Sequence, residues 1–153
     1  MIPKFMLTDA PTPQMRMAIV EPLVEFNNSR IGRPQVYRPL VILLSDPDSG
    51  EILGGIYGAT LFSYLHVDLL FVPEPLRGAG IGRKLMTDAE AEAVRRGCHA
   101  ASLDTFSFQA RGFYERLGYA AFGIIEDCPP GHSRIYLTKQ LGVKRMTSSA
   151  TAT

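Results

Sequence analysis

The sequence predicts an α/β (α+β) fold in which helices cover a mixed β-sheet. Three observations support this prediction. Short apolar runs that end at turn residues recur along the chain, as at residues 37–44 and 64–72. After Arg77, apolar residues recur mostly at three- and four-residue steps, which is the spacing of an amphipathic helix. Further strand patterns then alternate with a second short helical pattern as far as residue 137.

In the first part of the chain the expected order is strand, helix and hairpin. Residues 4–8 are expected to form a short strand, and a helix is expected to begin near Pro13. Pro22 lies inside this helical pattern and predicts a kink or two shorter helices, because proline has no N–H to donate. Residues 37–44 and 51–60 flank a segment rich in Asp, Ser, Pro and Gly, which predicts a β-hairpin.

The remaining elements follow from glycine, proline and periodicity. Glycines at 54, 55 and 58 weaken the second hairpin strand and predict a bulge or a close approach by another group. The next strand stops at Pro73, and the amphipathic helix ends with Gly97 in the C′ position. The last elements are expected to be a strand at 100–108, a helix at 110–117, and strands at 119–125 and 134–137.

The length and composition of the chain fit one domain. Of its 153 residues, 46% are hydrophobic and 20% are charged, which are ordinary values for a globular protein. We expect one domain over residues 1–142 and a disordered tail of small and polar residues at 143–153. The net charge of +1 creates no general attraction for nucleic acid or anionic lipid, so neither is expected as a partner.

Neither a long apolar run nor a signal peptide is evident, which predicts a cytoplasmic location. The two cysteines, Cys98 and Cys128, form no CxxC motif. Their spacing to His99 and His132 fits no zinc pattern, so we expect ordinary thiols and no metal site.

The segment most informative about function is residues 72–84, between a strand and the amphipathic helix. Glycine lets backbone approach a ligand closely, and the free N–H groups of a helix's first turn favour a phosphate. Basic side chains add positive charge, so a pyrophosphate is the expected ligand. The alternative is that the glycines only permit a tight turn. The segment contains Arg77, Gly78, Gly80, Gly82, Arg83 and Lys84.

Two other pyrophosphate ligands remain alternatives with less support. The spacing is not that of the Walker A loop of ATP-binding enzymes. A dinucleotide site for NAD needs an acidic residue at the end of a second strand, whereas Asp104 lies inside the following strand.

Residues 77–82 resemble the acetyl-CoA pyrophosphate loop of the GNAT superfamily of N-acetyltransferases, and Val72 and Pro73 precede it as they do there. Residues 110–119 resemble a later helix of the same family. The resemblance covers residues 64–137, while the first 60 residues match only in the order of their elements. It implies the GNAT fold: a mixed, mostly antiparallel central sheet with helices on both faces and splayed strands that form the slot for CoA.

The resemblance also implies acetyl-CoA as co-substrate and assigns residues to it. Backbone groups of Leu70, Phe71 and Val72 would pair with the pantetheine arm and hold the thioester carbonyl. Many relatives have an asparagine that contacts the arm where this chain has Ser107, so that contact is lost or is remade by Ser107 or Gln109. The pyrophosphate would be bound by Arg77, Gly78, Ala79, Gly80, Ile81, Gly82 and Arg83.

Tyr114 occupies the position of the family's general acid, near the thioester sulfur. The chemistry supports this role, because a tyrosine with a pKa near 10 readily protonates a leaving thiolate whose pKa is about 8.5. The alternative is that Tyr114 packs in the core beside Phe113. We expect direct attack without a covalent enzyme intermediate, because Cys98 follows a helix C-terminus, which raises the pKa of a thiol.

His66 and Asp68 are candidates for the general base. They are two residues apart on a strand and so share one face. The alternative is that they pair with each other or with a neighbouring strand. Glu126, Asp127 and His132 flank a stiff Pro-Pro-Gly segment, where they either border the acceptor site or are solvated loop charges.

Together these features predict an N-acetyltransferase that moves the acetyl group of acetyl-CoA to an amine of a small molecule, by direct attack in a ternary complex. The alternatives are acetylation of a protein amine and a non-catalytic CoA-binding sensor or scaffold. The residues identify neither the amine nor the length of the acyl group. A homodimer is compatible with the resemblance, because dimers are common in the family.

Overall fold

The computed structural model describes residues 1–142, so the predicted tail at 143–153 lies outside the described residues. The chain divides into two compact units, Met1–Gln35 and Val36–Thr153. The expectation of a single domain over residues 1–142 therefore stays a prediction.

The first unit contains one helix, α1 (Pro13–Ile31). The Thr12 side chain caps its start by accepting from the Met15 N–H at 3.3 Å, and Gly32 ends it in the left-handed conformation. The helix continues through Pro22, so the expectation of two shorter helices is wrong: the turns on either side hold the helix without the one N–H that proline lacks. The predicted strand at residues 4–8 does not form. It has no partner strand, and a lone strand leaves its backbone groups unpaired.

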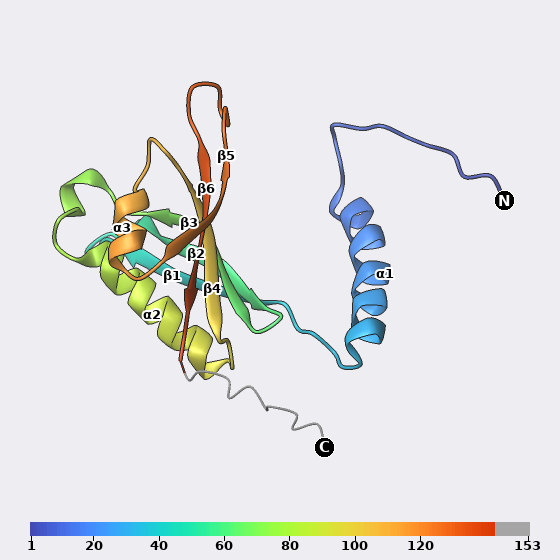
Figure 1. Cartoon of the computed structure of the whole chain (residues 1–153), viewed down its shortest axis with the longest axis horizontal. Coiled ribbons are helices and arrows are strands. Elements are labelled where there is room, and N and C mark those ends of the chain that lie inside the picture. The colour runs from blue at the N-terminus through green and yellow to red at the C-terminus, as the bar shows by residue number, and fades with distance from the viewer. Residues whose placement is uncertain (143–153) are drawn as a thin grey trace, which may run out of the picture. The chain divides into compact units, whose positions relative to one another are not determined.

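The second unit is built on an open six-stranded sheet with the order β1-β2-β3-β4-β6-β5 (Figure 1). Every neighbouring pair is antiparallel except β3 and β4, so the expected mixed, mostly antiparallel sheet is confirmed. The other predicted strands and the β1–β2 hairpin are also confirmed. The strands are β1 (Arg38–Ser45), β2 (Ile52–Leu61), β3 (Tyr64–Phe71), β4 (Ala100–Phe106), β5 (Ala120–Ile125) and β6 (Arg134–Gln140).

The glycines of β2 allow the close approach that the sequence suggested. The β2–β3 register shifts between Tyr57 and Gly58, but the extra residue of this bulge lies on β3 and not among the glycines of β2. A Cβ atom on Gly58 would lie 2.3 Å from the carbonyl oxygen of His66, so the two backbones approach too closely for any side chain.

Two α-helices complete this unit, α2 (Ile81–Arg95) and α3 (Arg111–Arg116), with a short 3-10 turn at Glu74–Leu76. They lie on the same side of the sheet (Figure 1), and Gly82 of α2 comes so close to α3 that a Cβ there would lie 3.3 Å from the Phe113 ring. Gly97 follows α2 with a φ of 84°, as expected for a C′ residue. The sequence also predicted a helix on the other face of the sheet. The remaining α-helix of residues 1–142, α1, belongs to the first unit.

The hydrophobic core lies between α2, α3 and the sheet. In this core, apolar side chains of α2 pack against the strand side chains that point toward the helix. The side chains that alternate with them along each strand therefore point to the opposite face of the sheet, away from α2. Its members include Leu65, Val67, Leu85, Met86, Ala89, Leu103 and Leu137.

Candidate functional site

The strands β3 and β4 separate partway along their length. They pair in parallel at only four positions, from Tyr64 opposite Ala100 to Val67 opposite Leu103. Beyond that point β3 pairs only with β2, and β4 pairs only with β6. The facing edges of the two strands are therefore left without a partner strand, and the predicted splay is confirmed.

A bulge lies at the start of this opening. Tyr57 pairs with Leu69 and Gly58 pairs with Val67, so Asp68 has no partner on β2. As a result Asp68 and Leu69 are both exposed, while Leu70 again packs against the core. The bulge therefore places an unpaired residue of β3 at the point where β3 leaves β4.

The loop between β3 and α2 is held by its own backbone and by one arginine. The Arg77 side chain turns back and its Nε donates to the Val72 carbonyl oxygen at 2.9 Å. This contact occupies the carbonyl of Val72, one of the residues predicted to pair with the pantetheine arm. Gly78 and Gly80 both have left-handed backbones, with φ of 81° and 78°, which other residues rarely adopt.

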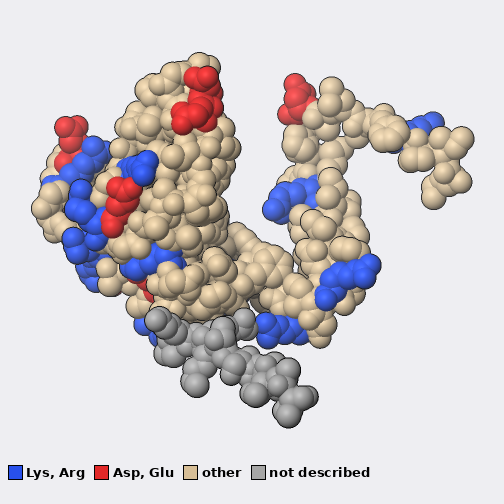
Figure 2. All heavy atoms as spheres, in the orientation of Figure 1, with Lys and Arg blue, Asp and Glu red and all other residues tan. Residues whose placement is uncertain are grey.

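The start of α2 has the features of an anion site that the sequence predicted. Gly80 is the N-cap of the helix, and no side chain caps it. The first backbone hydrogen bond of the helix runs from the Lys84 N–H to the Gly80 carbonyl at 2.9 Å, so the N–H groups before Lys84 have no helical partner. No atom lies within 4 Å of where a Cβ on Gly78 or Gly80 would be. Figure 2 shows basic side chains on the side of this unit that carries α2, with acidic ones between them. One such pair joins Lys84 to Asp88 at 2.7 Å.

Tyr114 is buried in α3, with 9% of its surface exposed. Its ring lies against those of Phe113 and Tyr119, at 5.1 and 6.1 Å between centroids. Burial raises the pKa of its phenol, and the carboxylate of Asp104 raises it further. The ring thus packs in the core as one alternative held, and the hydroxyl stays protonated at neutral pH.

His66 and Asp68 pair with each other, as the second alternative held. Nε2 of His66 lies 3.4 Å from Oδ1 of Asp68, and about half of each side chain is exposed. The other imidazole nitrogen, Nδ1, lies 3.1 Å from Oγ of Ser102 on β4.

An ion pair on β4 was not among the candidates from the sequence. Asp104 is the first residue of β4 beyond the paired segment, and its Oδ2 accepts from Nε of Arg134 at 2.7 Å. The Arg134 guanidinium also lies over the rings of Phe106 and Tyr136, at 5.7 and 5.3 Å. The sequence drew attention to Asp104 only as a nucleotide ligand, because no spacing links it to Arg134, 30 residues away.

Ser107 is bonded within the chain. Its Oγ accepts from the Ser133 N–H at 3.1 Å and lies 3.5 Å from Nδ1 of His132. Gln109 is engaged as well, because its Oε1 accepts from the hydroxyl of Thr105 at 3.0 Å. These bonds tie the end of β4 to its own loop and to the β5–β6 hairpin.

The acidic residues of that hairpin are also bonded locally. Glu126 accepts from the Ser133 hydroxyl at 2.9 Å, and Asp127 accepts from the Gly131 N–H at 3.3 Å. A place for these residues beside the acceptor, or as solvated loop charges, stays a prediction.

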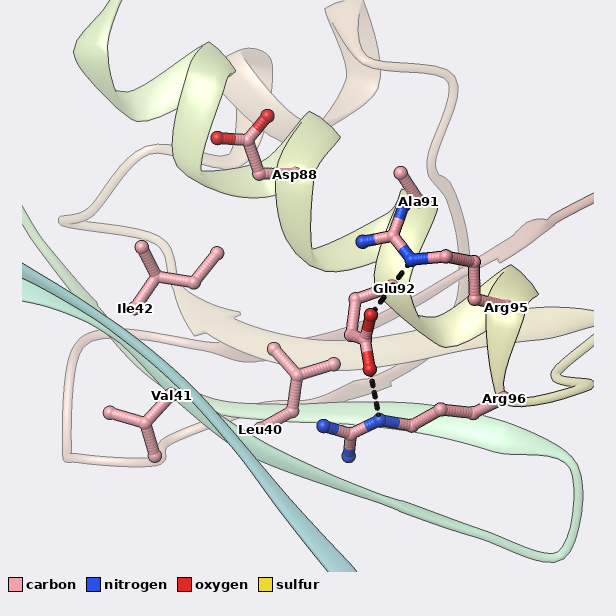
Figure 3. Close-up of a pocket in the computed structure, with 8 residues that line it drawn as sticks. All are labelled: Leu40, Val41, Ile42, Asp88, Ala91, Glu92, Arg95 and Arg96. Atoms are coloured by element: carbon pink, nitrogen blue, oxygen red, sulfur yellow. Dashed lines mark hydrogen bonds and ion pairs between the residues drawn. The ribbon is translucent and has the colours of Figure 1, made fainter.

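A pocket of about 380 Å³ lies elsewhere, between β1 and α2 (Figure 3). None of its lining residues is a predicted site residue, and β1 is two strands away from β3. Glu92 accepts from both Arg95 and Arg96 there, and Arg96 also donates to the Pro39 carbonyl at 2.9 Å. Three of its charged groups therefore bond one another and the fourth, Asp88, bonds Lys84, so we place the candidate site at the β3–β4 opening.

No group of three or more His, Cys, Asp or Glu side chains within residues 1–142 is arranged to hold a metal ion. None of the helices described there is long and apolar enough to cross a membrane.

Comparison with known proteins gives consistent findings. The model of the acetyltransferase (GNAT) family matches residues 11–119. An acetyltransferase of Agrobacterium fabrum is 39% identical over 136 residues, covering 89% of this chain and 98% of that protein. The blasticidin-S acetyltransferase of Streptomyces morookaense is 44% identical over 95 residues, or 61% of this chain and 70% of its own. The crystal structure of an acetyltransferase from Agrobacterium tumefaciens superposes with a TM-score of 0.83 at 38% identity, covering 90% of this chain and 99% of that one.

Proposed function

Because the chain belongs to the acetyltransferase (GNAT) family, which uses acetyl-CoA, we propose that it transfers the acetyl group of acetyl-CoA to an amine of a small molecule. The observation that carries this proposal is the β3–β4 opening, which has an uncapped, glycine-rich helix start after β3 and a buried tyrosine in the helix after β4. The similarity to an enzyme named for blasticidin S supports a small-molecule acceptor.

In this proposal the opening holds the co-substrate. The pantetheine arm lies along the free edge of β3 and pairs with backbone groups of Leu70, Phe71 and Val72, apart from the Val72 carbonyl that Arg77 occupies. The N–H groups of residues 77–83 bind the pyrophosphate, because the left-handed glycines leave the backbone open beside the positive end of α2. Ser107 contacts the arm only if its Oγ gives up the hydrogen bond from the Ser133 N–H and bonds to the arm in its place.

The reaction is a direct attack of the neutral acceptor amine on the thioester carbonyl. The C–N bond forms, the C–S bond breaks, and Tyr114 gives its proton to the departing thiolate. A phenol whose pKa is raised by burial keeps that proton available through the neutral and mildly alkaline range. The proton that the amine loses passes to His66, which is paired with Asp68.

The test is Tyr114→Phe, which removes one oxygen and keeps the ring. We expect kcat to fall by roughly ten- to a thousandfold with little change in the KM for acetyl-CoA. Thiol release across a panel of small amines measures both constants. Tyr37→Phe is the matched control, because Tyr37 is exposed and lies outside the candidate site.

Thermal shift separates the co-substrate from the chemistry. A ligand that binds only the folded chain raises its Tm, so acetyl-CoA and CoA should stabilise both the natural chain and Tyr114→Phe. A shift with ATP or NAD but none with CoA would contradict the proposal. Stabilisation by CoA without thiol release for any amine would indicate a CoA-binding module, and an unchanged kcat in Tyr114→Phe would remove Tyr114 from the mechanism.

A further inference from the structure

Ser102 lies opposite His66 across the only parallel strand pair of the described sheet. The parallel register places Ser102 directly beside His66, one position before the last pair of β3 and β4. On its other side Ser102 pairs with Thr138 of β6, so its backbone is held from both sides. Its Oγ lies 3.1 Å from Nδ1 of His66, at the inner end of the opening.

The partners of His66 favour one of its two neutral forms. An ionised carboxylate attracts a hydrogen, so Oδ1 of Asp68, 3.4 Å from Nε2, favours the form with its hydrogen on that nitrogen. In that form Nδ1 is the acceptor, and the Ser102 hydroxyl, 3.1 Å away, is placed to donate to it. The lone pair that would take up a proton is therefore reached through the hydroxyl of Ser102.

A serine hydroxyl suits both protonation states of this histidine. It donates to Nδ1 when the ring is neutral and, after rotation about its C–O bond, accepts from Nδ1–H when the ring is charged. The ring can therefore gain a proton without moving, because both of its nitrogens keep their partners.

We propose that Ser102 relays the proton of the acceptor amine to His66. This inference rests on the proposed function and adds a residue that touches the acceptor. As the C–N bond forms, the amine N–H bond breaks and its proton passes to Oγ of Ser102. The hydroxyl proton of Ser102 passes at the same time to Nδ1 of His66, so serine ends neutral and histidine carries the charge.

The other charged groups near this relay are already bonded. Asp104 lies two residues farther along β4, beyond the last pair, and its carboxylate accepts from Arg134. The β2 residue opposite His66 is Ala59, which cannot titrate. Within the described residues, Asp68 is the one charged group in contact with the ring of His66.

The test compares Ser102→Ala with Ser102→Thr. We expect Ser102→Ala to lower kcat by roughly ten- to a hundredfold, because the proton loses its path, and threonine, which keeps the hydroxyl, to restore most of that loss. Acetyl-CoA should raise the Tm of all three proteins equally. Ser49→Ala in the β1–β2 turn is the matched control for the loss of a serine hydroxyl.

A proton inventory in mixtures of H2O and D2O distinguishes a relay from a structural role. The relay moves two protons in the natural chain, in addition to the one that Tyr114 gives to the thiolate, so the plot of its rate against deuterium fraction should be more strongly curved than that of Ser102→Ala. An unchanged rate in Ser102→Ala, or equal curvature in the two proteins, would overturn the relay while Tyr114→Phe still tests the proposed function. Absence of thiol release by the natural chain with every amine would remove both proposals.

Discussion

Cys98 follows α2 and is 6% exposed, and burial raises the pKa of its thiol while the nearby charge of Arg96 opposes that rise. The sequence attributed a raised pKa to the helix C-terminus, whereas the structure gives burial as the main cause. A thiol that stays protonated is a poor nucleophile. We therefore expect Cys98→Ala to keep kcat within about twofold of the natural value, because reactivity requires the thiolate.

Initial rates at saturating acetyl-CoA measure this effect, and the Tm shift with CoA serves as the control for folding. Cys128→Ala is the parallel variant of a partly buried cysteine on the hairpin. Loss of turnover in either variant, with the CoA shift intact, would indicate a covalent enzyme intermediate and contradict direct transfer.

At this scale the sequence predicted local relations better than distant ones. The two-residue spacing of His66 and Asp68 was enough to place them on one face, and they pair there. Ser102 escaped notice because its contact with His66 depends on the register of two strands that are 36 residues apart. The alternation of apolar residues fixes the face on which each side chain lies, but it does not say which residue of a distant strand lies opposite.

Among the elements, β2 is the strand that most depends on glycine. We expect Gly58→Ala to lower the free energy of unfolding by about 1–3 kcal/mol, because its Cβ would meet the His66 carbonyl and force β2 away from β3. Urea unfolding followed by circular dichroism measures this change, which suits a chain without tryptophan.

Gly123→Ala on β5 is the matched control. Its Cβ would lie 4.0 Å from Tyr136, which is an ordinary contact, and we expect a change within about 0.5 kcal/mol. Equal losses in the two variants would show that glycine is needed for chain flexibility and not for the close approach of two backbones.

The elements that the sequence predicted well are those with a strong period or a clear stop signal. The helix ending before Gly97 and the strand ending before Pro73 are examples. The strand expected at residues 4–8 failed because apolar composition cannot supply a partner. Of the two outcomes predicted for Pro22, two shorter helices did not form, because the rest of α1 is long enough to hold the helix around one missing bond.

At the scale of the molecule, one polar cluster joins α2 to the strands that follow it. Glu90 of α2 accepts from the Tyr119 hydroxyl at 2.9 Å and from the Lys139 ammonium of β6 at 2.6 Å. Burial raises the pKa of Tyr119 well above its usual value, and the negative charge of Glu90 raises it further.

This cluster predicts a loss of stability at alkaline pH. The unfolded chain releases the Tyr119 proton at a pKa of about 10, while the folded chain retains it, so the contribution of Tyr119 is complete below pH 10 and is lost as the pH rises above it. We expect Tyr119→Phe to cost about 1.5–3 kcal/mol of unfolding free energy at pH 8, and this difference from the natural chain to shrink above pH 10. Urea unfolding at several pH values checks this, and a difference that stays constant would contradict it.

The short contact between β3 and β4 makes this sheet two antiparallel ribbons, β1-β2-β3 and β4-β6-β5, joined by a seam of four residue pairs. Each ribbon is hydrogen-bonded along nearly its whole length, so these four pairs are the only strand contacts between the two halves of the described sheet. A ligand that bonds to a free edge beyond them would act as an added strand. Filling the opening would then also extend the contact between the two ribbons.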